Sequence, residues 1–254
     1  MVNLKISIIT ISYNSAQYIE QTIQSVVSQT CQDKEYIVVD GGSTDGTIEI
    51  IKKYEGKIDK WVSGPDKGIA DAMNKGLALA SGDFVMFLHS DDYFVDEFVL
   101  STAASHLSAG YEIFLFNIFL SNNGESRLTR PRGLNWWMNL KTGVFHQSAI
   151  SARSLFERIG NFDTGFRIAM DYDFFLRAYR AGAHAKIIDF PLSVMRLCGV
   201  SSQLDWASLG ERFAEEKLIH IKNCSSFVLR FIYFWYWLFY PGYRYCKSRL
   251  WAKS

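Results

Sequence analysis

The sequence predicts an α/β fold with a Rossmann-like, mostly parallel central sheet flanked by helices, followed by an aromatic helical appendage at the C-terminus. Three observations support this prediction. Strand-like apolar runs alternate with segments of helical periodicity over residues 5–92, a pattern that implies parallel strands joined by right-handed crossovers. These runs are nearly continuous in apolar residues, as in strands covered on both faces. Aromatic residues make up 15% of the chain, and they concentrate near its C-terminus.

The expected elements of the first half follow in order. Apolar residues at helical spacing, among them Ile19, Ile23 and Val26, predict a helix after the first strand, with Asn14 or Ser15 as its N-cap. The expected strands cover residues 5–11, 35–40, 61–62 and 83–92, and the expected helices lie within 12–30, around 45–51 and over 68–82.

The second half is less regular. We expect strands over 112–120 and 185–190, a helix over 170–182, and an amphipathic segment over 205–222. The segment 122–133 reads as a polar loop, and it carries Arg127, Arg130 and Arg132. No linker interrupts the chain up to residue 222, so one domain and a C-terminal appendage over 223–254 are expected.

Composition excludes some classes of partner. The formal net charge is +1, so no global field points to nucleic acid. The four cysteines are scattered, and none forms a C-x-x-C pair, which is typical of reduced thiols in a cytoplasmic protein. The opening "MVNLKISIITISYNS" has a short apolar run broken by polar residues, and it does not predict a signal peptide.

Three strand ends carry polar residues, at 12–14, 40–43 and 90–92. Ligands of open parallel sheets bind beyond the carboxyl ends of the strands, so these ends are expected to line one crevice. Asp91 and Asp92 are candidate ligands for Mg²⁺ or Mn²⁺, which prefer carboxylate oxygens; a turn or helix N-cap is the alternative. Asp40 is a candidate acceptor for a base or ribose, or a turn acid before two glycines.

A second pair of acids lies in "AMDYDFFLR". Asp171 or Asp173 could act as a general base toward a sugar hydroxyl, or could stabilise a helix N-terminus. Their side chains point about 200° apart on a helix, so only one of them is expected to face the crevice.

Several motifs, in this order, resemble family 2 glycosyltransferases of the GT-A fold. They are "SIITISYNSAQYIEQTIQSVVSQT", "EYIVVDGGSTDGT", "GPDKGIADAMNKGLALASGDFVMFLHSDD", "FHQSAI" and "MDYDFFLRA". The resemblance covers roughly residues 5–200, and the motifs look most similar to bacterial enzymes that build O-antigen, capsule or colanic-acid-type polysaccharides. It implies a nucleotide-binding half over about 1–95 and an acceptor-side half over about 96–222.

The resemblance also implies roles for individual residues. Asp91 and Asp92 match the DxD-like element, with Asp92 expected on the metal and Asp91 nearer the ribose. Asp171 matches the catalytic base, with Asp173 as the second choice because Met170 replaces the family's usual glutamate. The expected donor-binding residues are Ser12, Tyr13, Asp40, Lys67, Asp71 and Asp91, with Asp40 accepting a hydrogen bond from uracil. A further departure is Gly41, where many relatives have aspartate, and His146 would contact acceptor or phosphate unless it is simply packed.

The implied activity is inverting transfer of a sugar from a nucleotide-sugar, by resemblance a UDP-sugar, to a saccharide or polyprenyl-diphosphate-linked acceptor, with Mg²⁺ or Mn²⁺ as cofactor. Two other classes remain open: a nucleotidyltransferase that makes activated sugars, and a non-catalytic nucleotide-sugar-binding scaffold. The first needs a glycine-rich, basic loop after the first strand, and "ISYNSAQY" contains neither glycine nor a basic residue. The second would not need Asp171.

The C-terminal stretch "FVLRFIYFWYWLFY" is intensely aromatic and is followed by a basic cluster. It is shorter than the roughly 20 apolar residues of a membrane-spanning helix. Aromatic residues beside basic ones favour a helix that lies in the interface of an anionic membrane, and a core or homodimer helix is the alternative. We therefore expect a cytoplasmic protein bound peripherally to the inner face of a bacterial inner membrane.

Overall fold

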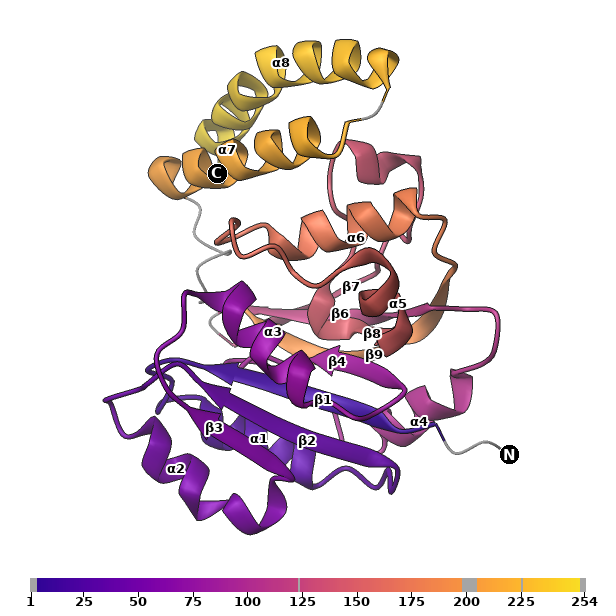
Figure 1. Cartoon of the computed structure of the whole chain (residues 1–254). Coiled ribbons are helices and arrows are strands. Elements are labelled where there is room, and N and C mark those ends of the chain that lie inside the picture. Colours follow the sequence, from indigo (N-terminus) through magenta and orange to yellow (C-terminus); the bar gives the residue numbers. More distant parts are fainter. Residues whose placement is uncertain (1–3, 123, 198–204, 225, 252–254) are drawn as a thin grey trace.

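The computed structural model describes residues 4–122, 124–197, 205–224 and 226–251. At its centre lies a nine-stranded mixed sheet of order β3-β2-β1-β4-β8-β6-β9-β5, with β7 paired to β6 (Figure 1). The strands are β1 (Ile6–Ser12), β2 (Lys34–Asp40), β3 (Lys60–Ser63), β4 (Phe84–Phe87), β5 (Tyr93–Phe94), β6 (Ile113–Asn122), β7 (Glu125–Thr129), β8 (Ala149–Ala152) and β9 (Ala185–Arg196).

Helices cover both faces of this sheet. The α-helices are α1 (Ile19–Val27), α2 (Thr47–Lys53), α3 (Ile69–Leu79), α4 (Val99–His106), α5 (Arg153–Ile159), α6 (Met170–Arg180), α7 (Trp206–Lys222) and α8 (Phe227–Trp251). The 3-10 helices are η1 (Glu55–Lys57), η2 (Trp136–Asn139) and η3 (His146–Ser148). The predicted fold class is therefore confirmed: a mostly parallel α/β sheet, flanked by helices, with aromatic C-terminal helices.

The nucleotide-side half of the sheet is parallel, with β1 between β2 and β4. Successive side chains of β1 enter opposite cores, because strand residues alternate between faces. Ile9 packs in the core beneath α3, α5 and α6, whereas Ile8 packs in the core with α1, α2 and α4. Gly76 lets α3 approach this strand closely, since a Cβ at that position would stand 2.3 Å from Cγ2 of Ile9.

The other half departs from the expected topology. The strand β8 runs antiparallel to both β4 and β6, and β9 continues to Arg196, where the sequence predicted a strand ending at 190. The segment expected to be a polar loop contains β7, which pairs antiparallel with β6. This strand was missed because it lies at an edge where its side chains are exposed, so it shows no apolar alternation.

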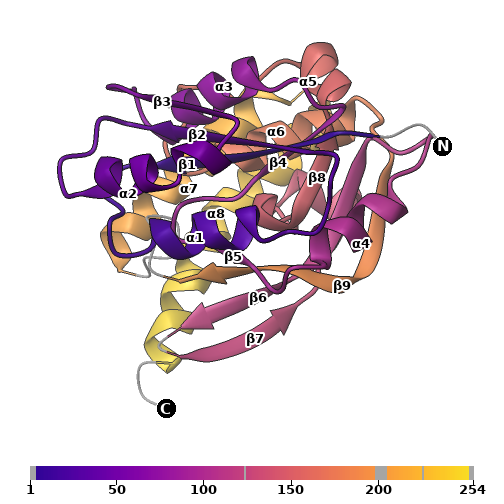
Figure 2. The same cartoon turned by 90° about the horizontal axis from the view of Figure 1, so that it is seen from below.

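The C-terminal helices form a further layer on the α6 side of the sheet (Figures 1 and 2). The helix α7 lies against α8, and the outermost position belongs to α8. Cys31, Cys224 and Cys246 are free thiols, and Cys198 falls outside the described residues.

Candidate active site

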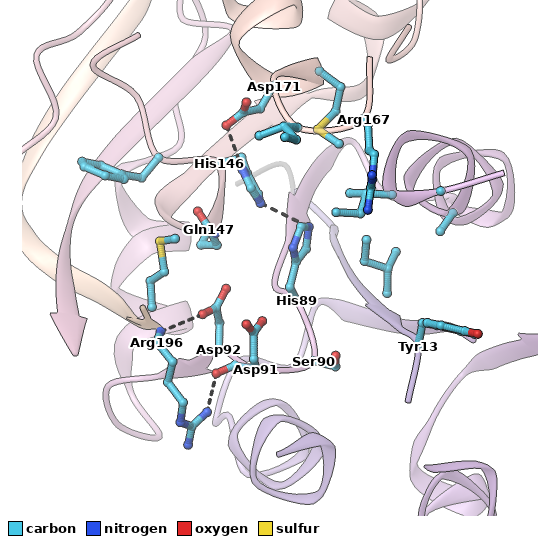
Figure 3. A pocket seen from close by; sticks show the side chains of 18 of the residues that line it. Tyr13, His89, Ser90, Asp91, Asp92, His146, Gln147, Arg167, Asp171 and Arg196 are labelled. Atoms are coloured by element: carbon cyan, nitrogen blue, oxygen red, sulfur yellow. Dashed lines mark hydrogen bonds and ion pairs between the residues drawn. The ribbon is translucent and has the colours of Figure 1, made fainter. Parts of the chain in front are cut away.

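A cavity of about 880 Å³ opens beyond the carboxyl ends of β1 and β4. Its walls come from the loop after β1, the turn after β4, η3, the start of α6, the end of β9 and one side of α7 (Figure 3). Two of the three predicted strand ends, 12–14 and 90–92, line it. These two strand ends lie together because β1 and β4 are parallel neighbours, whose carboxyl ends lie at the same edge of the sheet.

The acidic turn after β4 presents two carboxylates of different character. Asp92 is 1% exposed, and its Oδ1 accepts a hydrogen bond from the backbone N–H of Arg196 at 3.1 Å. Burial, and then the neighbouring charge of Asp91, raise the pKa of Asp92 well above its ordinary value. Asp91 is only partly buried, and it lines the cavity beside Asp92 (Figure 3).

Arg196 places a positive charge at this turn. Its guanidinium donates to the backbone carbonyl of Asp91 and to Gln21. It is held between two aromatic rings, with Cζ 4.9 Å from the ring centre of Tyr18 and 4.7 Å from that of Tyr93. Its side chain bonds no carboxylate oxygen of Asp92, whose pKa stays raised. A divalent cation bound at this turn would favour the ionised form of Asp92.

His89, Asp91 and Asp92 offer ligand atoms that all lie within 4.8 Å of one another. Two carboxylates and one imidazole form a donor set suited to Mg²⁺ or Mn²⁺, and more so to Mn²⁺ because imidazole is the softer ligand. The residues present therefore fit the divalent cation that the sequence predicted. Asp91 and Asp92 were expected in this cluster; His89 was not assigned a role from the sequence.

A chain of hydrogen bonds connects this cluster to Asp171. Asp171 Oδ2 lies 3.1 Å from Nδ1 of His146, and Nε2 of His146 lies 3.1 Å from Nε2 of His89 (Figure 3). Burial acts to raise the pKa of Asp171, but the hydrogen bonds from His146 and from the backbone of Tyr172 outweigh it, so this pKa lies below its ordinary value. Burial, and then His146, lower the pKa of His89 well below its usual range.

The lowered pKa of Asp171 sets the direction of its hydrogen bond with His146. An ionised Asp171 only accepts, so Nδ1–H of His146 donates to it. Nε2 of His146 and Nε2 of His89 share one hydrogen bond, and the tautomers of the two rings decide which nitrogen donates. The lowered pKa of His89 favours its neutral ring, the form in which an imidazole binds a metal.

The helix α6 separates its two acids as the sequence predicted. Asp171 lines the cavity, with its side chain 20% exposed. Asp173 is 0% exposed and does not line the cavity. Its carboxylate bonds Nε of Arg177 at 2.8 Å and the Asn223 side chain at 2.9 Å. The second choice for the base is therefore a buried acid that ties α6 to the end of α7.

Two of the predicted donor-binding residues face the cavity: Ser12 lines it, and Tyr13 projects at its rim with 66% exposure. Three others, Asp40, Lys67 and Asp71, do not line it. Asp40 is 1% exposed, and its oxygens are filled by the Ser12, Ser43 and Ser63 hydroxyls and the backbone of Gly42 and Ser43. Lys67 and Asp71 lie at the exposed start of α3, where Asp71 accepts from the Lys67 backbone at 3.0 Å and pairs with Lys75 at 3.1 Å. Their contacts are local and organise the loop rather than the cavity wall.

Asp66 enters the cavity wall beside Gly41, although sequence reasoning gave it no role. A Cβ on Gly41 would stand only 2.5 Å from Oδ2 of Asp66 and 3.3 Å from the ring of Tyr13. The Asp66 carboxylate therefore occupies the space that a side chain at position 41 would need. The glycine at position 41, already noted in the sequence, was the signal that another side chain could occupy this space.

The comparisons agree with this fold. The chain matches the Glycosyl transferase family 2 profile over residues 7–187, and it belongs to that family of enzymes. It is 38% identical over 178 residues to an uncharacterized glycosyltransferase of Mycobacterium tuberculosis, covering 68% of each chain. It is 31% identical over 189 residues to a PGL/p-HBAD biosynthesis glycosyltransferase of Mycobacterium bovis, covering 68% of this chain and 69% of the relative.

Solved structures show the same fold. Staphylococcus aureus TarS 1–349 in complex with UDP-GlcNAc matches with a TM-score of 0.70 and 24% identity over 88% of this chain and 68% of that one. This chain spans 40% of the longer TarS chain. The mannosyltransferase PcManGT from Pyrobaculum calidifontis, in complex with GDP-Man and Mn²⁺, matches with a TM-score of 0.67 and 19% identity over 90% of this chain and 67% of that one.

Proposed function

We propose that this chain is an inverting, metal-dependent glycosyltransferase that moves a sugar from a UDP-sugar to a hydroxyl of a saccharide or polyprenyl-diphosphate-linked acceptor. One observation carries the proposal: the His89, Asp91 and Asp92 cluster and the ionised Asp171 face a single cavity. One site for a metal-bound diphosphate and one base for a hydroxyl are the two parts that such a transfer needs.

The donor half of the cavity fits a nucleoside diphosphate. When bound at His89, Asp91 and Asp92, Mg²⁺ or Mn²⁺ would neutralise the diphosphate and so assist its departure. Tyr13 offers an aromatic face at the rim, and we propose that Asp66 accepts the hydrogen bond from the nucleobase, in place of the enclosed Asp40. A carboxylate acceptor suits uracil, whose N3 carries a proton, and disfavours cytosine, whose N3 does not.

The acceptor half uses Asp171. The acceptor oxygen attacks the anomeric carbon while its proton passes to Asp171, and the bond from that carbon to the diphosphate oxygen breaks in the same displacement. His146 holds the carboxylate in place and keeps it ionised through the 3.1 Å hydrogen bond. The enzyme forms no covalent intermediate, and the configuration at the anomeric carbon inverts.

The biological setting of this transfer is part of the proposal. We place the chain in the assembly of a cell-surface glycoconjugate, such as an O-antigen, capsule or colanic-acid-type polysaccharide. The naming of the Mycobacterium bovis relative for PGL/p-HBAD biosynthesis supports a surface glycolipid or polysaccharide setting. Residues 1–222 would form the transferase domain, with about 1–95 binding the nucleotide and about 96–222 facing the acceptor.

The decisive experiment compares donor binding with transfer. A screen of nucleotide-sugars with Mn²⁺ identifies the donor, and Asp171→Asn is then tested for UDP binding by calorimetry and for turnover. Binding within about twofold of wild type with turnover reduced about 10²–10⁴-fold is the expected result. Asp189→Asn is the matched control, because its exposed ion pair with Arg130 lies outside the cavity lining. Unchanged turnover in Asp171→Asn would refute its role as base.

The two alternative functions predict other outcomes. A nucleotidyltransferase would release diphosphate from a nucleoside triphosphate and a sugar phosphate. A scaffold would bind UDP, and neither the wild type nor Asp171→Asn would turn over a donor. The position of Asp171, held ionised in the cavity wall, favours transfer over both.

A further inference from the structure

The helix α8 has two faces of opposite character. Its inner face packs on α7 through Tyr233, Tyr236, Trp237 and Tyr240, with the Tyr233 ring stacked on His220 at 4.3 Å. Its outer face exposes between 44% and 84% of each of eight apolar side chains. These residues, called here the outer face of α8, are Phe227, Val228, Phe231, Phe234, Trp235, Leu238, Phe239 and Tyr243.

The distribution of polar atoms over the two faces is the reverse of that on a water-facing helix. The aromatic residues with a hydroxyl or an indole N–H mostly lie inside, where Trp237 donates to His220 at 3.0 Å and Tyr233 accepts from Arg180 at 2.8 Å. The outer face consists largely of Phe, Val and Leu, which have no polar atoms in their side chains. At 100° per residue its members fall on one continuous side of the helix, about half of the circumference. Such a large contiguous apolar patch marks an interaction surface.

Charge along the same part of the chain selects the partner. No Asp or Glu follows Glu216, whereas the remaining residues include seven Lys and Arg: Lys217, Lys222, Arg230, Arg244, Lys247, Arg249 and Lys253. Lys253 lies outside the described residues. An apolar helix face accompanied by basic residues and free of acids complements the surface of an anionic bilayer, whose interface also favours Trp and Tyr.

We propose that the outer face of α8 binds an anionic lipid membrane, with the helix lying in the plane of the interface. Within the described residues, no helix is long and apolar enough to cross a membrane. The helix also carries two charged side chains, those of Arg230 and Arg244, and its inner face is packed against protein. Both features fit a helix with only one side in lipid.

This placement gives the cavity an orientation, a step that rests on the proposed function. The helix α7 contacts α8 through Phe213 and His220 and lines the cavity through Arg212 and Glu216. One helix layer therefore separates the cavity from the membrane-facing helix, which lies outermost in Figure 1. An acceptor whose lipid anchor stays in the same bilayer would extend its sugar past α7 to reach the Asp171 side of the cavity.

The test is co-sedimentation of the whole chain with vesicles, without nucleotide. Wild type should sediment with phosphatidylglycerol-containing vesicles and less with pure phosphatidylcholine vesicles. High salt should reduce its sedimentation with the phosphatidylglycerol-containing vesicles. The triple variant Phe231→Ser, Phe234→Ser, Leu238→Ser should lower the partition coefficient at least about tenfold. Val62→Ser removes an apolar side chain that is 41% exposed on β3, and this control should sediment like wild type.

Three results would overturn the inference: no sedimentation of wild type with anionic vesicles, unchanged sedimentation of a folded triple variant, or equal loss in the control. Light scattering supplies a further check, since a dimer that dissociates in the triple variant without any vesicle binding would assign the face to a second copy of this chain. Asp171→Asn should sediment like wild type, so a failure of the catalytic proposal is distinguishable from a failure of this one.

Discussion

Replacing His146 by leucine should raise the pKa of Asp171. In the structure two opposing effects act on this carboxyl: burial raises its pKa, and the hydrogen bond from Nδ1 of His146 at 3.1 Å is the largest effect that lowers it. A hydrogen bond to a charged group contributes about 1.5–3 kcal/mol. At 1.36 kcal/mol per pKa unit, its loss should raise the pKa of Asp171 by about 1–2 units.

The consequence is a shift in the pH dependence of transfer. A base works only when it is deprotonated, so the acidic limb of the kcat/KM profile should move about 1–2 pH units toward alkaline pH. Activity at acidic pH should then fall far more than activity on the alkaline plateau. Steady-state assays across the pH range, with the donor identified by the nucleotide-sugar screen, measure this shift directly.

Two further variants make the test specific to the hydrogen bond. His146→Asn can present an amide N–H near the position of Nδ1, so its acidic limb should lie closer to that of wild type. His106→Leu removes a histidine of α4 that is outside the cavity lining, and its profile should not move. An acidic limb in His146→Leu that stays within a few tenths of a pH unit of wild type would refute the assigned link between His146 and Asp171.

Three other predictions follow from named contacts. Glu35 is 2% exposed, and the salt bridge and hydrogen bonds from Lys60, Ser7 and Ser81 outweigh its burial and lower its pKa to about 2. This depressed pKa adds about 3 kcal/mol of stability above pH ~4.5, lost as pH falls toward ~2, so urea unfolding should show Glu35→Gln clearly destabilised at pH 7 and little changed near pH 2. Gly41→Ala should weaken UDP binding about tenfold in calorimetry, because its Cβ would displace the Asp66 carboxylate. Chelation by EDTA should abolish transfer, and excess Mn²⁺ should restore it in wild type but poorly in Asp91→Asn.

The first half of the fold could be predicted because its parallel strands are buried on both faces. A strand such as β1, with every residue buried, gives a continuous apolar run that stands out in the sequence. The second half gives weaker signals. The short β8 is recognisable only through its pairing with β4 and β6, and β7 exposes most of its side chains at an edge. These strands form because they pair with strands that are distant in the sequence, and the local hydrophobic periodicity does not reveal such pairing.

The residues of the candidate site also differ in whether the sequence could predict them. Asp91, Asp92 and the two acids of α6 could be predicted as candidates because they stand in local motifs at the end of a strand or the start of a helix. The resemblance favoured Asp171 over Asp173, and Asp171 is the one that lines the cavity. Arg196 could not be predicted, because it meets the acidic turn from a strand 104 residues after Asp92. His89 stood in the quoted motif, but its link to His146 depends on how η3 packs against the end of β4. Asp40 shows the converse: its position matched a binding residue, yet five hydrogen bonds enclose it.

The aromatic tail is more closely integrated than a separate appendage would be. Trp237 donates its indole N–H to Nδ1 of His220, so the proton of a neutral His220 must lie on Nε2, 2.7 Å from the Tyr172 hydroxyl. Burial, followed by the charge of Arg180, lowers the pKa of His220 to about 3, so the ring stays neutral at physiological pH. The Tyr172 hydroxyl in turn donates to the carbonyl of Met138 at 2.8 Å.

This hydrogen-bond chain runs from the inner face of α8 to the residue that follows Asp171. It links α6, α7 and α8 through a histidine whose lowered pKa keeps it uncharged at neutral pH. A helix fixed to α6 in this way would hold the base at a constant depth and orientation relative to whatever surface the outer face of α8 contacts. If that surface is a membrane, the same contacts that bury the aromatic inner face also set the direction from which a lipid-anchored hydroxyl meets Asp171.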